Sequence, residues 1–517
     1  MSDKKDSILW ADDEIDLLKP HILFLEAKGY EVTPVISGQD AIDCCQNQSF
    51  DIIFLDENMP GISGLETLVA IKEIVPQTPV VMVTKNEEES IMDQAIGNKI
   101  ADYLIKPVNP LQLVLTIKKN LHKKDIISET TTVNYQQEFS HLSSRINDRL
   151  SAEEWKEIYK RLVYWELELE QNKNPMAEIL HAQKKEACHS FVKYVKRNYV
   201  DWLSNPKERP VMSHDLMKKK VFPLLDQGDK VFFVLIDNFR FDQWLAVKNL
   251  LEADFTFEED MYYSILPTAT QYARNAIFSG LLPDMIAKMF PNLWVDEESE
   301  EGKNLNEKPL IQTLIDRYRK KYSFSYNKVL DSNYGEKLND RLQTLNDRQL
   351  NVIVLNFVDM LSHARTESKM IRELAQTEAA YRSLTRSWFE HSTTLELFKQ
   401  IAKMGYKIVL TTDHGTIQVD SPLRIIGDRN TNTNLRYKVG KNLSFKKKDV
   451  FVIDQPSKVG LPSPNLSSKY IFATNENFFA YPNNYNYYVS YYKNTFQHGG
   501  LSLEEMLIPC ITMTPKK

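Results

Sequence analysis

The stretch Ile52-Ile53-Phe54-Leu55-Asp56 decides the fold of the first part of the chain. Its four apolar residues form a continuous run, which is typical of a strand buried on both faces of a parallel sheet. An acidic residue, Asp56, stands directly after the run. Because open parallel sheets bind ligands at the carboxyl ends of their strands, Asp56 is a candidate site residue.

Similar runs lie on both sides of this stretch and alternate with amphipathic helical patterns between residues 7 and 121. We expect five strands, at 8–10, 30–35, 52–55, 80–83 and 103–105. Five strands and five helices predict a doubly wound α/β domain of the flavodoxin-like kind. We place this domain at residues 5–122.

Polar residues follow several of these strands. Asp12 and Asp13 come after the first, Asp56 after the third, Thr84 after the fourth and Lys106 after the fifth. A carboxylate can attack a phosphoryl group only if the charge of that group is neutralised. The sequence supplies a nucleophile in Asp56, two further carboxylates that could hold Mg²⁺, and a lysine that could pair with phosphate.

These residues, in this order, resemble the receiver domains of two-component response regulators. The resemblance implies that a sensor histidine kinase phosphorylates Asp56 and that the backbone carbonyl of Asn58 completes the Mg²⁺ site. It also implies that Thr84 and Tyr103 act as a coupled switch, which remodels the face carrying the fourth and fifth helices. Receivers commonly self-associate through this face, and the apolar and basic stretch 108–119 supports a homodimer on phosphorylation.

Residues 123–206 have apolar residues at helical spacing and no strand pattern, which predicts a helical linker bundle. Ser151 and Glu154 have the spacing of a capping box, in which each side chain satisfies a free backbone N–H of the other residue.

The third region, residues 207–517, begins a new α/β pattern with three short buried runs at 231–236, 352–357 and 408–411. Acidic residues close these runs: Asp237, Asp359 and Asp413. The polar stretches 283–348 and 421–466 are expected to be insertions that decorate the sheet.

Carboxylates and imidazoles at the ends of buried strands are costly without a partner, and a pair of divalent cations would satisfy them together. Two metal ions about 4 Å apart can clamp the attacking and leaving oxygens of a phosphoryl displacement. The candidate metal ligands are Asp237, Thr270, Asp359, His363, Asp413, His414 and His498.

This set resembles the PglZ-like branch of the alkaline phosphatase superfamily. The resemblance implies that Asp237, Thr270, Asp413 and His414 hold one zinc ion and that Asp359, His363 and His498 hold the other. It also implies that Thr270 is the nucleophile, because the run Pro267-Thr268-Ala269-Thr270 matches that of the nucleotide phosphodiesterases in the superfamily. Thr268 is the alternative nucleophile, and it could equally be a helix cap. Arg274, one helical turn beyond Thr270, could bind a substrate phosphate bidentately or form a surface salt bridge.

The three regions together resemble the response regulators of type IX secretion. That resemblance implies a sensor histidine kinase of the PorY type as partner, with the cytoplasmic side of the secretion motor and an extracytoplasmic-function sigma factor as further partners. Two hypotheses follow. The chain is a metal-dependent phosphodiesterase or phosphatase acting on nucleotides or oligonucleotides under the control of phosphorylation. Alternatively, it is a signalling scaffold whose phosphatase-like domain binds metal without physiological turnover.

Composition narrows the class of protein. The net charge of -6 argues against a dominant nucleic-acid footprint, and no DNA-binding module is recognisable. Four dispersed cysteines fit neither a disulfide framework nor a thiolate zinc site. With no signal-peptide pattern and no apolar run long enough to span a bilayer, we expect a cytoplasmic protein without a membrane segment.

Overall fold

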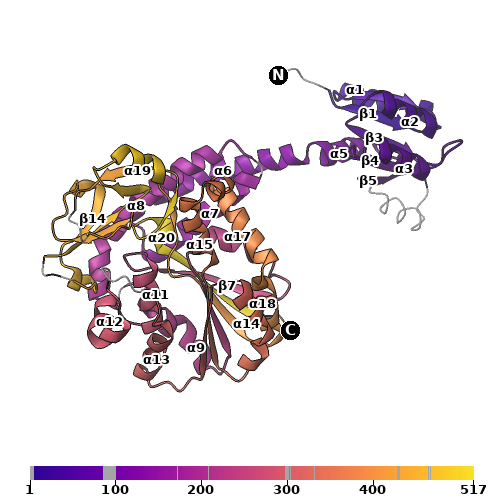
Figure 1. Ribbon diagram of the computed structural model, residues 1–517. Coiled ribbons are helices and arrows are strands. Elements are labelled where there is room, and N and C mark those ends of the chain that lie inside the picture. The colour runs from indigo at the N-terminus through magenta and orange to yellow at the C-terminus, as the bar shows by residue number, and fades with distance from the viewer. Residues whose placement is uncertain are drawn as a thin grey trace. The chain divides into compact units, whose positions relative to one another are not determined.

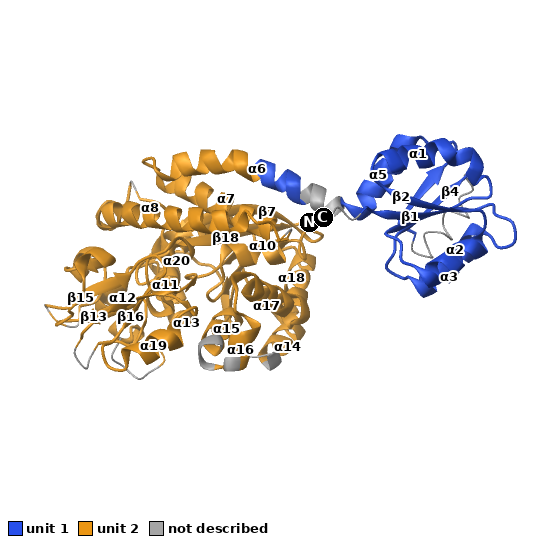
Figure 2. Ribbon diagram, turned by 90° about the horizontal axis from the view of Figure 1, so that it is seen from above, with its two compact units in different colours: residues 1–134 blue, residues 135–517 orange. Residues whose placement is uncertain are grey.

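The computed structural model describes residues 5–516 except 86–99, 172, 208, 297–301, 303, 331, 428–430, 464 and 466. The chain divides into two compact units, residues 1–134 and 135–517 (Figure 2). In the part of the chain that the structure describes, we find no helix long and apolar enough to cross a membrane.

The first unit contains a five-stranded sheet in the order β2-β1-β3-β4-β5, with every pair parallel. Its strands are β1 (Ser7–Ala11), β2 (Glu31–Val35), β3 (Ile52–Asp56), β4 (Val80–Thr84) and β5 (Asp102–Ile105). Its helices are η1 (Ile15–Leu18), α1 (Lys19–Ala27), α2 (Gly38–Asn47), α3 (Gly64–Ile74) and α5 (Pro110–Leu121). The doubly wound fold is as predicted, and the expected fourth helix falls outside the described residues.

Three long helices follow, as the periodicity predicts: α6 (Lys123–Ile146), α7 (Ala152–Gln171) and α8 (Ala177–Ser204). The predicted capping box is present before α7. The Ser151 backbone N–H donates to the Glu154 carboxylate at 2.9 Å, and the Glu154 N–H donates to the Ser151 hydroxyl at 3.3 Å. The buried faces of α7 and α8 belong to the same apolar core as the following domain, so these two helices are an integral part of the second unit.

A six-stranded sheet in the order β7-β18-β10-β6-β9-β8 forms the centre of the second unit. Its strands are β6 (Val231–Ile236), β7 (Phe255–Tyr263), β8 (Phe324–Val329), β9 (Leu350–Leu355), β10 (Lys407–Thr411) and β18 (Leu507–Pro515). The four strands β10, β6, β9 and β8 are parallel to one another. β18 pairs antiparallel with β10, and β7 in turn pairs antiparallel with β18. The carboxyl ends of β6, β9 and β10 therefore meet at one edge.

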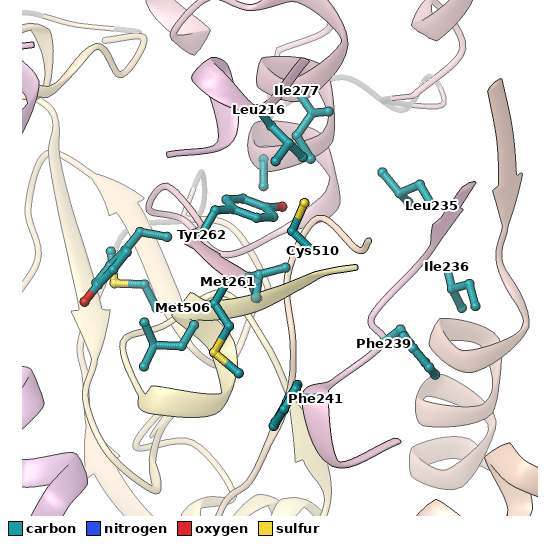
Figure 3. Packing of buried hydrophobic residues seen from close by; sticks show 14 of the residues in the cluster. Leu216, Leu235, Ile236, Phe239, Phe241, Met261, Tyr262, Ile277, Met506 and Cys510 are labelled. Atoms are coloured by element: carbon teal, nitrogen blue, oxygen red, sulfur yellow. The ribbon is translucent and has the colours of Figure 1, made fainter. Parts of the chain in front are cut away.

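Helices cover both faces of this sheet (Figure 1). The helices and turns between β6 and β18, with those just before β6, are η2 (Ser213–Asp215), η3 (Met217–Val221), α9 (Phe222–Asp226), α10 (Phe241–Lys248), α11 (Thr270–Ser279), α12 (Pro283–Met289), η4 (Pro291–Leu293), α13 (Glu307–Arg317), α14 (Ser332–Asp340), η5 (Leu342–Leu345), α15 (Phe357–Glu367), α16 (Lys369–Leu374), α17 (Glu378–His391), α18 (Thr393–Lys403), η6 (Lys447–Asp449), η7 (Pro456–Val459), α19 (Tyr485–Tyr492) and α20 (Leu503–Met506). Side chains from the end of β6, from β7, from β18 and from α11 contribute to the packed interior in Figure 3.

Two sequence expectations need correction. The run at 352–357 is not one strand: β9 ends at Leu355 and α15 begins at Phe357, so Asp359 lies in the first helical turn rather than at a strand end. The stretch 283–348 is not only an insertion, because it contains β8, an edge strand of the central sheet. β8 is a half-exposed edge strand, so polar residues fit there. These polar residues hide the strand pattern in the sequence.

The stretch 421–466 does lie outside the central sheet. It contributes β12 (Ser421–Arg424), β13 (Tyr437–Gly440) and β14 (Val450–Ile453) to two small sheets, with β15 (Lys469–Ala473) and β16 (Asn477–Ala480) as partners. A further two-stranded sheet pairs β11 (Ile417–Gln418) with β17 (Phe496–Gln497).

Candidate functional site

In the first unit the strand-end residues lie together. Lys106 Nζ lies 2.6 Å from Asp12 Oδ2 and 3.2 Å from Asp56 Oδ1, and the lysine and both carboxylates are largely buried. Carboxylate oxygens of Asp12, Asp13 and Asp56 lie within 4.8 Å of one another, a spacing that one hard cation could bridge. Thr84 is buried at the end of β4, and Asn58 lies in the loop after β3.

Burial and the neighbouring charges shift the pKa of Asp56. Burial raises the pKa of Asp56, the positive charge of Lys106 acts against that rise, and Asp12 adds to it. Three carboxylates face one lysine here, so a divalent cation would complete the neutralisation.

In the second unit, two further sets could each hold a metal ion, and each has its ligand atoms within 4.8 Å of one another. We call them cluster A (Asp237, Asp413 and His414) and cluster B (Asp359, His363 and His498). These are the two groups that the resemblance implies. They adjoin one another, because the rings of His414 and His498 stack with centroids 4.1 Å apart.

Thr270 is the first residue of α11, and its hydroxyl lies 3.0 Å from His414 Nε2. The helix begins there because Ala269 is extended and Thr270 starts the helical turns. A helix N-terminus carries partial positive charge, which favours negative charge developing on an oxygen at that position. The Thr270 hydroxyl thus lies at a helix N-terminus and beside the imidazole of cluster A.

The two stacked histidines are oriented as metal ligands usually are. His414 Nδ1 lies 3.2 Å from the carbonyl of Gly415, and His498 Nδ1 lies 3.2 Å from the carbonyl of Thr268. If each Nδ1–H donates to its carbonyl, each Nε2 keeps a lone pair that faces the clusters. The residues present therefore fit zinc, which prefers imidazole together with carboxylate.

The two clusters differ in exposure. The side chains of Asp413 and His414 are 0% exposed, whereas that of His363 is 61% exposed. His363 Nε2 lies 3.4 Å from Asp359 Oδ2, and His498 Nε2 lies 3.9 Å from Asp359 Oδ1. Cluster B is therefore the side of the site that opens to solvent.

The pKa shifts indicate strong interactions in both clusters. Burial raises the pKa of Asp237 well above its usual value, and the neighbouring Asp413 carboxylate raises it further. Burial opposes ionisation of Asp359, yet the hydrogen bond from His363 and the electrostatic interaction with the His498 ring lower its pKa. Burial lowers the pKa of His498 to about 3, which keeps its imidazole neutral and able to bind a metal ion.

The structure gives Arg274 a different environment from the one expected for a phosphate ligand. Its side chain is fully buried; Nε donates to Asp413 Oδ2 at 3.0 Å, and the guanidinium also pairs with Asp237. Its third partner is Glu307, at 3.3 Å. These carboxylates engage the guanidinium in buried ion pairs within cluster A, not in the surface salt bridge that was the alternative, and phosphate binding by Arg274 stays a prediction.

Thr268, the alternative nucleophile, is also occupied. Its hydroxyl donates to the carbonyl of Gly500 at 2.7 Å and accepts from the N–H of Gly499 at 3.2 Å. It is not the helix cap, since Ala269 holds that position. These bonds connect the segment before α11 to the loop that carries His498.

Sequence reasoning missed Glu307, which is almost fully buried and contacts Arg274, Tyr326 and Lys328. It lies at the start of α13, within the stretch interpreted as an insertion. An acidic residue at the first helical position normally serves the helix N-terminus, so no signal in the sequence distinguishes this one.

A model of the family described as the BREX system PglZ alkaline phosphatase-like domain matches residues 216–513, more than half of the chain. The chain belongs to the PglZ family. Two other family models match this PglZ-family protein: the PorX response regulator linker domain at residues 125–203 and the response regulator receiver domain at residues 8–118. The order of the three domains is that of PorX response regulators, which confirms the resemblance seen in the sequence.

Curated relatives of this PglZ-family protein match about a quarter of its length. Transcriptional regulatory protein ResD of Bacillus subtilis (strain 168) is 34% identical over 140 residues, which cover 26% of this chain and 58% of the relative. Transcriptional regulatory protein SrrA of Staphylococcus aureus (strain NCTC 8325 / PS 47) is 28% identical over 142 residues, covering 26% and 57%. The chain thus spans less than two thirds of the length of these relatives.

Among solved structures, a CheY-like response regulator receiver domain protein from Methanospirillum hungatei JF-1 is similar to this chain. The two are 27% identical with a TM-score of 0.23, and the match covers 23% of this chain and 96% of that one.

Proposed function

We propose that this response regulator is phosphorylated on Asp56 and carries a two-zinc phosphodiesterase in its PglZ domain, with Thr270 as nucleophile and nucleotides or oligonucleotides as substrates. The observation that supports this most is the position of the Thr270 hydroxyl, 3.0 Å from His414 Nε2, between a helix N-terminus and cluster A. Clusters A and B would each hold one zinc ion.

When bound, the zinc ions would act as Lewis acids that neutralise charge on the phosphoryl group. The Thr270 hydroxyl would lose its proton and attack phosphorus as the bond to the leaving oxygen breaks, and that oxygen would leave as an alcohol after taking up a proton. A water molecule would then cleave the bond between phosphorus and the threonine oxygen, which releases a phosphate monoester and restores the hydroxyl. The N-terminus of α11 favours the negative charge that develops on the threonine oxygen. The stacked rings of His414 and His498 keep the two clusters adjacent throughout.

In the receiver domain, Asp56 would form an acyl phosphate with the phosphoryl group of a histidine kinase. Lys106 would pair with a phosphate oxygen, and Asp12, Asp13 and the Asn58 carbonyl would hold Mg²⁺, which supplies charge neutralisation when bound. By resemblance, the kinase is of the PorY type, and further partners are the cytoplasmic side of the type IX secretion motor and an extracytoplasmic-function sigma factor. We place the protein in the cytoplasm and expect it to dimerise on phosphorylation.

The scaffold hypothesis also has an observation in its favour. Arg274 pairs with two carboxylates of cluster A, so the cluster is partly neutralised by the chain itself. Such a site can persist for structural reasons without turnover. Under this hypothesis, phosphorylation controls partner binding and the PglZ domain contributes a binding surface.

A panel of phosphomonoesters and phosphodiesters, assayed with zinc-loaded protein beside its Thr270→Val variant, separates the two. We expect diester hydrolysis by the parent that disappears in the variant while both proteins carry equal zinc. Equal turnover by parent and variant, or no turnover of any ester, favours the scaffold.

A further inference from the structure

Helix α19, with the sequence YNYYVSYY, carries five tyrosines in eight residues. One face is anchored: Tyr485, Val489 and Tyr492 pack on a small apolar cluster beneath the helix. The other face is open, with Tyr487 64% exposed and Tyr488 39% exposed. Large aromatic rings kept in water on a fixed helix are typical of a binding surface.

The exposed ring of Tyr487 and the guanidinium of Arg372 both lie beside the ring of Tyr491. Tyr487 and Tyr491 lie nearly parallel, with their centroids 6.1 Å apart and their planes 17° apart. The guanidinium of Arg372 lies over the ring of Tyr491, 5.0 Å from its centroid. We call Arg372, Tyr487, Tyr488 and Tyr491 the aromatic platform. Tyr491 thus has both Arg372 and Tyr487 as neighbours, and the ring of Tyr488 lies nearly perpendicular to that of Tyr487.

Two chain segments connect the platform to cluster B. After α19, residues 493–497 lead through β17 directly to His498, and β17 pairs with β11, which begins three residues after His414. Helix α15, which carries His363, contacts β17 and is followed at once by α16, which carries Arg372. The segments that converge at cluster B thus converge again where Arg372 covers Tyr491.

The two chain segments that carry the platform lead to cluster B, which is the solvent-exposed part of the site. Cluster A is fully buried, whereas the side chain of His363 in cluster B is 61% exposed. The parts of a substrate that extend beyond the reacting phosphate must leave on the exposed side, where His363 lies on α15, the helix that precedes α16 in the chain.

We propose that the aromatic platform is a stacking subsite for the bases of a single-stranded oligonucleotide whose phosphodiester enters the metal clusters. This inference rests on the proposed phosphodiesterase function and narrows its substrate class. Every base has a π-face, so tyrosine rings and an arginine plane bind single strands without regard to sequence.

The charge around the platform is compatible with this ligand. Helix α19 has no acidic residue that would repel phosphates, and the exposed Lys493 follows it directly. The chain as a whole carries a net charge of -6, so general electrostatic attraction cannot supply the affinity for a polyanion. Stacking is the interaction that this surface offers instead.

The test compares two diesters on the full zinc-loaded chain: single-stranded tetrathymidylate, which has bases to stack, and bis(p-nitrophenyl) phosphate, which fits within the clusters. Replacing both Tyr487 and Tyr491 by Ala should raise KM for tetrathymidylate on the order of tenfold to hundredfold, because each stacked base contributes about 1–3 kcal/mol. Turnover of the small diester should stay at the parent value. Tyr487→Phe, which keeps the ring, should resemble the parent.

A matched control is Tyr164→Ala, which removes a tyrosine that is 46% exposed on linker helix α7 and should change neither substrate. An unchanged KM for tetrathymidylate in the double variant overturns the platform, as does a parent that hydrolyses the small diester but not the oligonucleotide. In both cases the proposed phosphodiesterase survives.

A binding measurement covers the case in which the parent hydrolyses neither diester, so that the proposed function itself fails. Fluorescence anisotropy of labelled tetrathymidylate with the parent should then still report binding that the double variant loses, which supports the platform as an oligonucleotide site. Equal binding by the two proteins, or none by the parent, overturns it, and a protein partner would then be the better occupant.

Discussion

The receiver site and the PglZ site are built on the same principle and differ in their donor atoms. Each gathers acidic groups around the carboxyl ends of parallel strands, and each sets one cationic side chain against them: Lys106 in the receiver and Arg274 in the PglZ domain. The receiver offers carboxylates only, whereas the PglZ site adds three imidazoles.

Donor chemistry, rather than position in the fold, therefore separates the two proposed roles. An all-oxygen site suits Mg²⁺, which binds weakly enough to be exchanged as the acyl phosphate forms and decays. Imidazoles suit zinc. The proposed nucleophiles follow the same division, because the receiver presents a carboxylate and the PglZ site presents a hydroxyl at a helix N-terminus.

The largest effect is expected at the receiver. Asp56→Ala removes the attacking carboxylate, so uptake of the acyl-phosphate mimic beryllofluoride should fall from one equivalent to none. Binding can be followed by fluorine NMR. Asp43→Ala, which removes an exposed carboxylate on α2, should bind the mimic like the parent. Stoichiometric binding by Asp56→Ala would place the phosphoacceptor elsewhere.

In the PglZ site, Thr270→Val keeps the shape of the side chain and removes its hydroxyl. Diester hydrolysis should fall by several orders of magnitude, up to about a million-fold, as for other nucleophile deletions. Zinc content should stay close to that of the parent. Thr268→Val is the matched comparison: it removes a buried hydroxyl that bonds Gly500, so it should lower stability first and the rate constant far less.

Much of this layout could be predicted from the sequence, because buried strands leave continuous apolar runs and the residues after them are easily read. Asp56, Asp237 and Asp413 were found in this way. Asp359 was grouped correctly with His363, although it lies on α15 rather than at a strand end.

The remainder depends on contacts between distant segments. The spacing from Thr270 places Arg274 one turn away, but only the structure shows that Asp413 and Asp237 face it. Likewise β8 carries too few apolar residues to be distinguished from a loop, because an edge strand needs burial on fewer sides.

The cationic residue of the PglZ site, Arg274, is expected to stabilise the metal-free protein. Arg274→Met leaves two buried carboxylates without their counter-ion, which should lower the free energy of unfolding of metal-free protein by about 3–5 kcal/mol. Added zinc should restore part of this loss. Denaturant unfolding with and without chelator measures both quantities, and Arg161→Met, which breaks an exposed pair with Glu138, should cost at most about 1 kcal/mol. An equal loss in the two variants would contradict the role of Arg274.

The smallest effect is a change in assembly. Exposed apolar residues on β5 and α5, among them Ile105, Leu111 and Leu115, form the receiver face expected to mediate dimerisation. Beryllofluoride should therefore double the mass observed by light scattering at micromolar concentration. Leu111→Lys should prevent the doubling without affecting uptake of the mimic. An unchanged mass in the parent would argue against the dimer.

Anomalous diffraction at the zinc edge tests the central claim most directly, because it locates each ion without an assay. We expect two zinc peaks in the PglZ domain, one among Asp237, Asp413 and His414 and the other among Asp359, His363 and His498, and none at Asp56. His498→Ala should lose the second peak and keep the first. The absence of zinc at both clusters in zinc-soaked crystals would contradict the account.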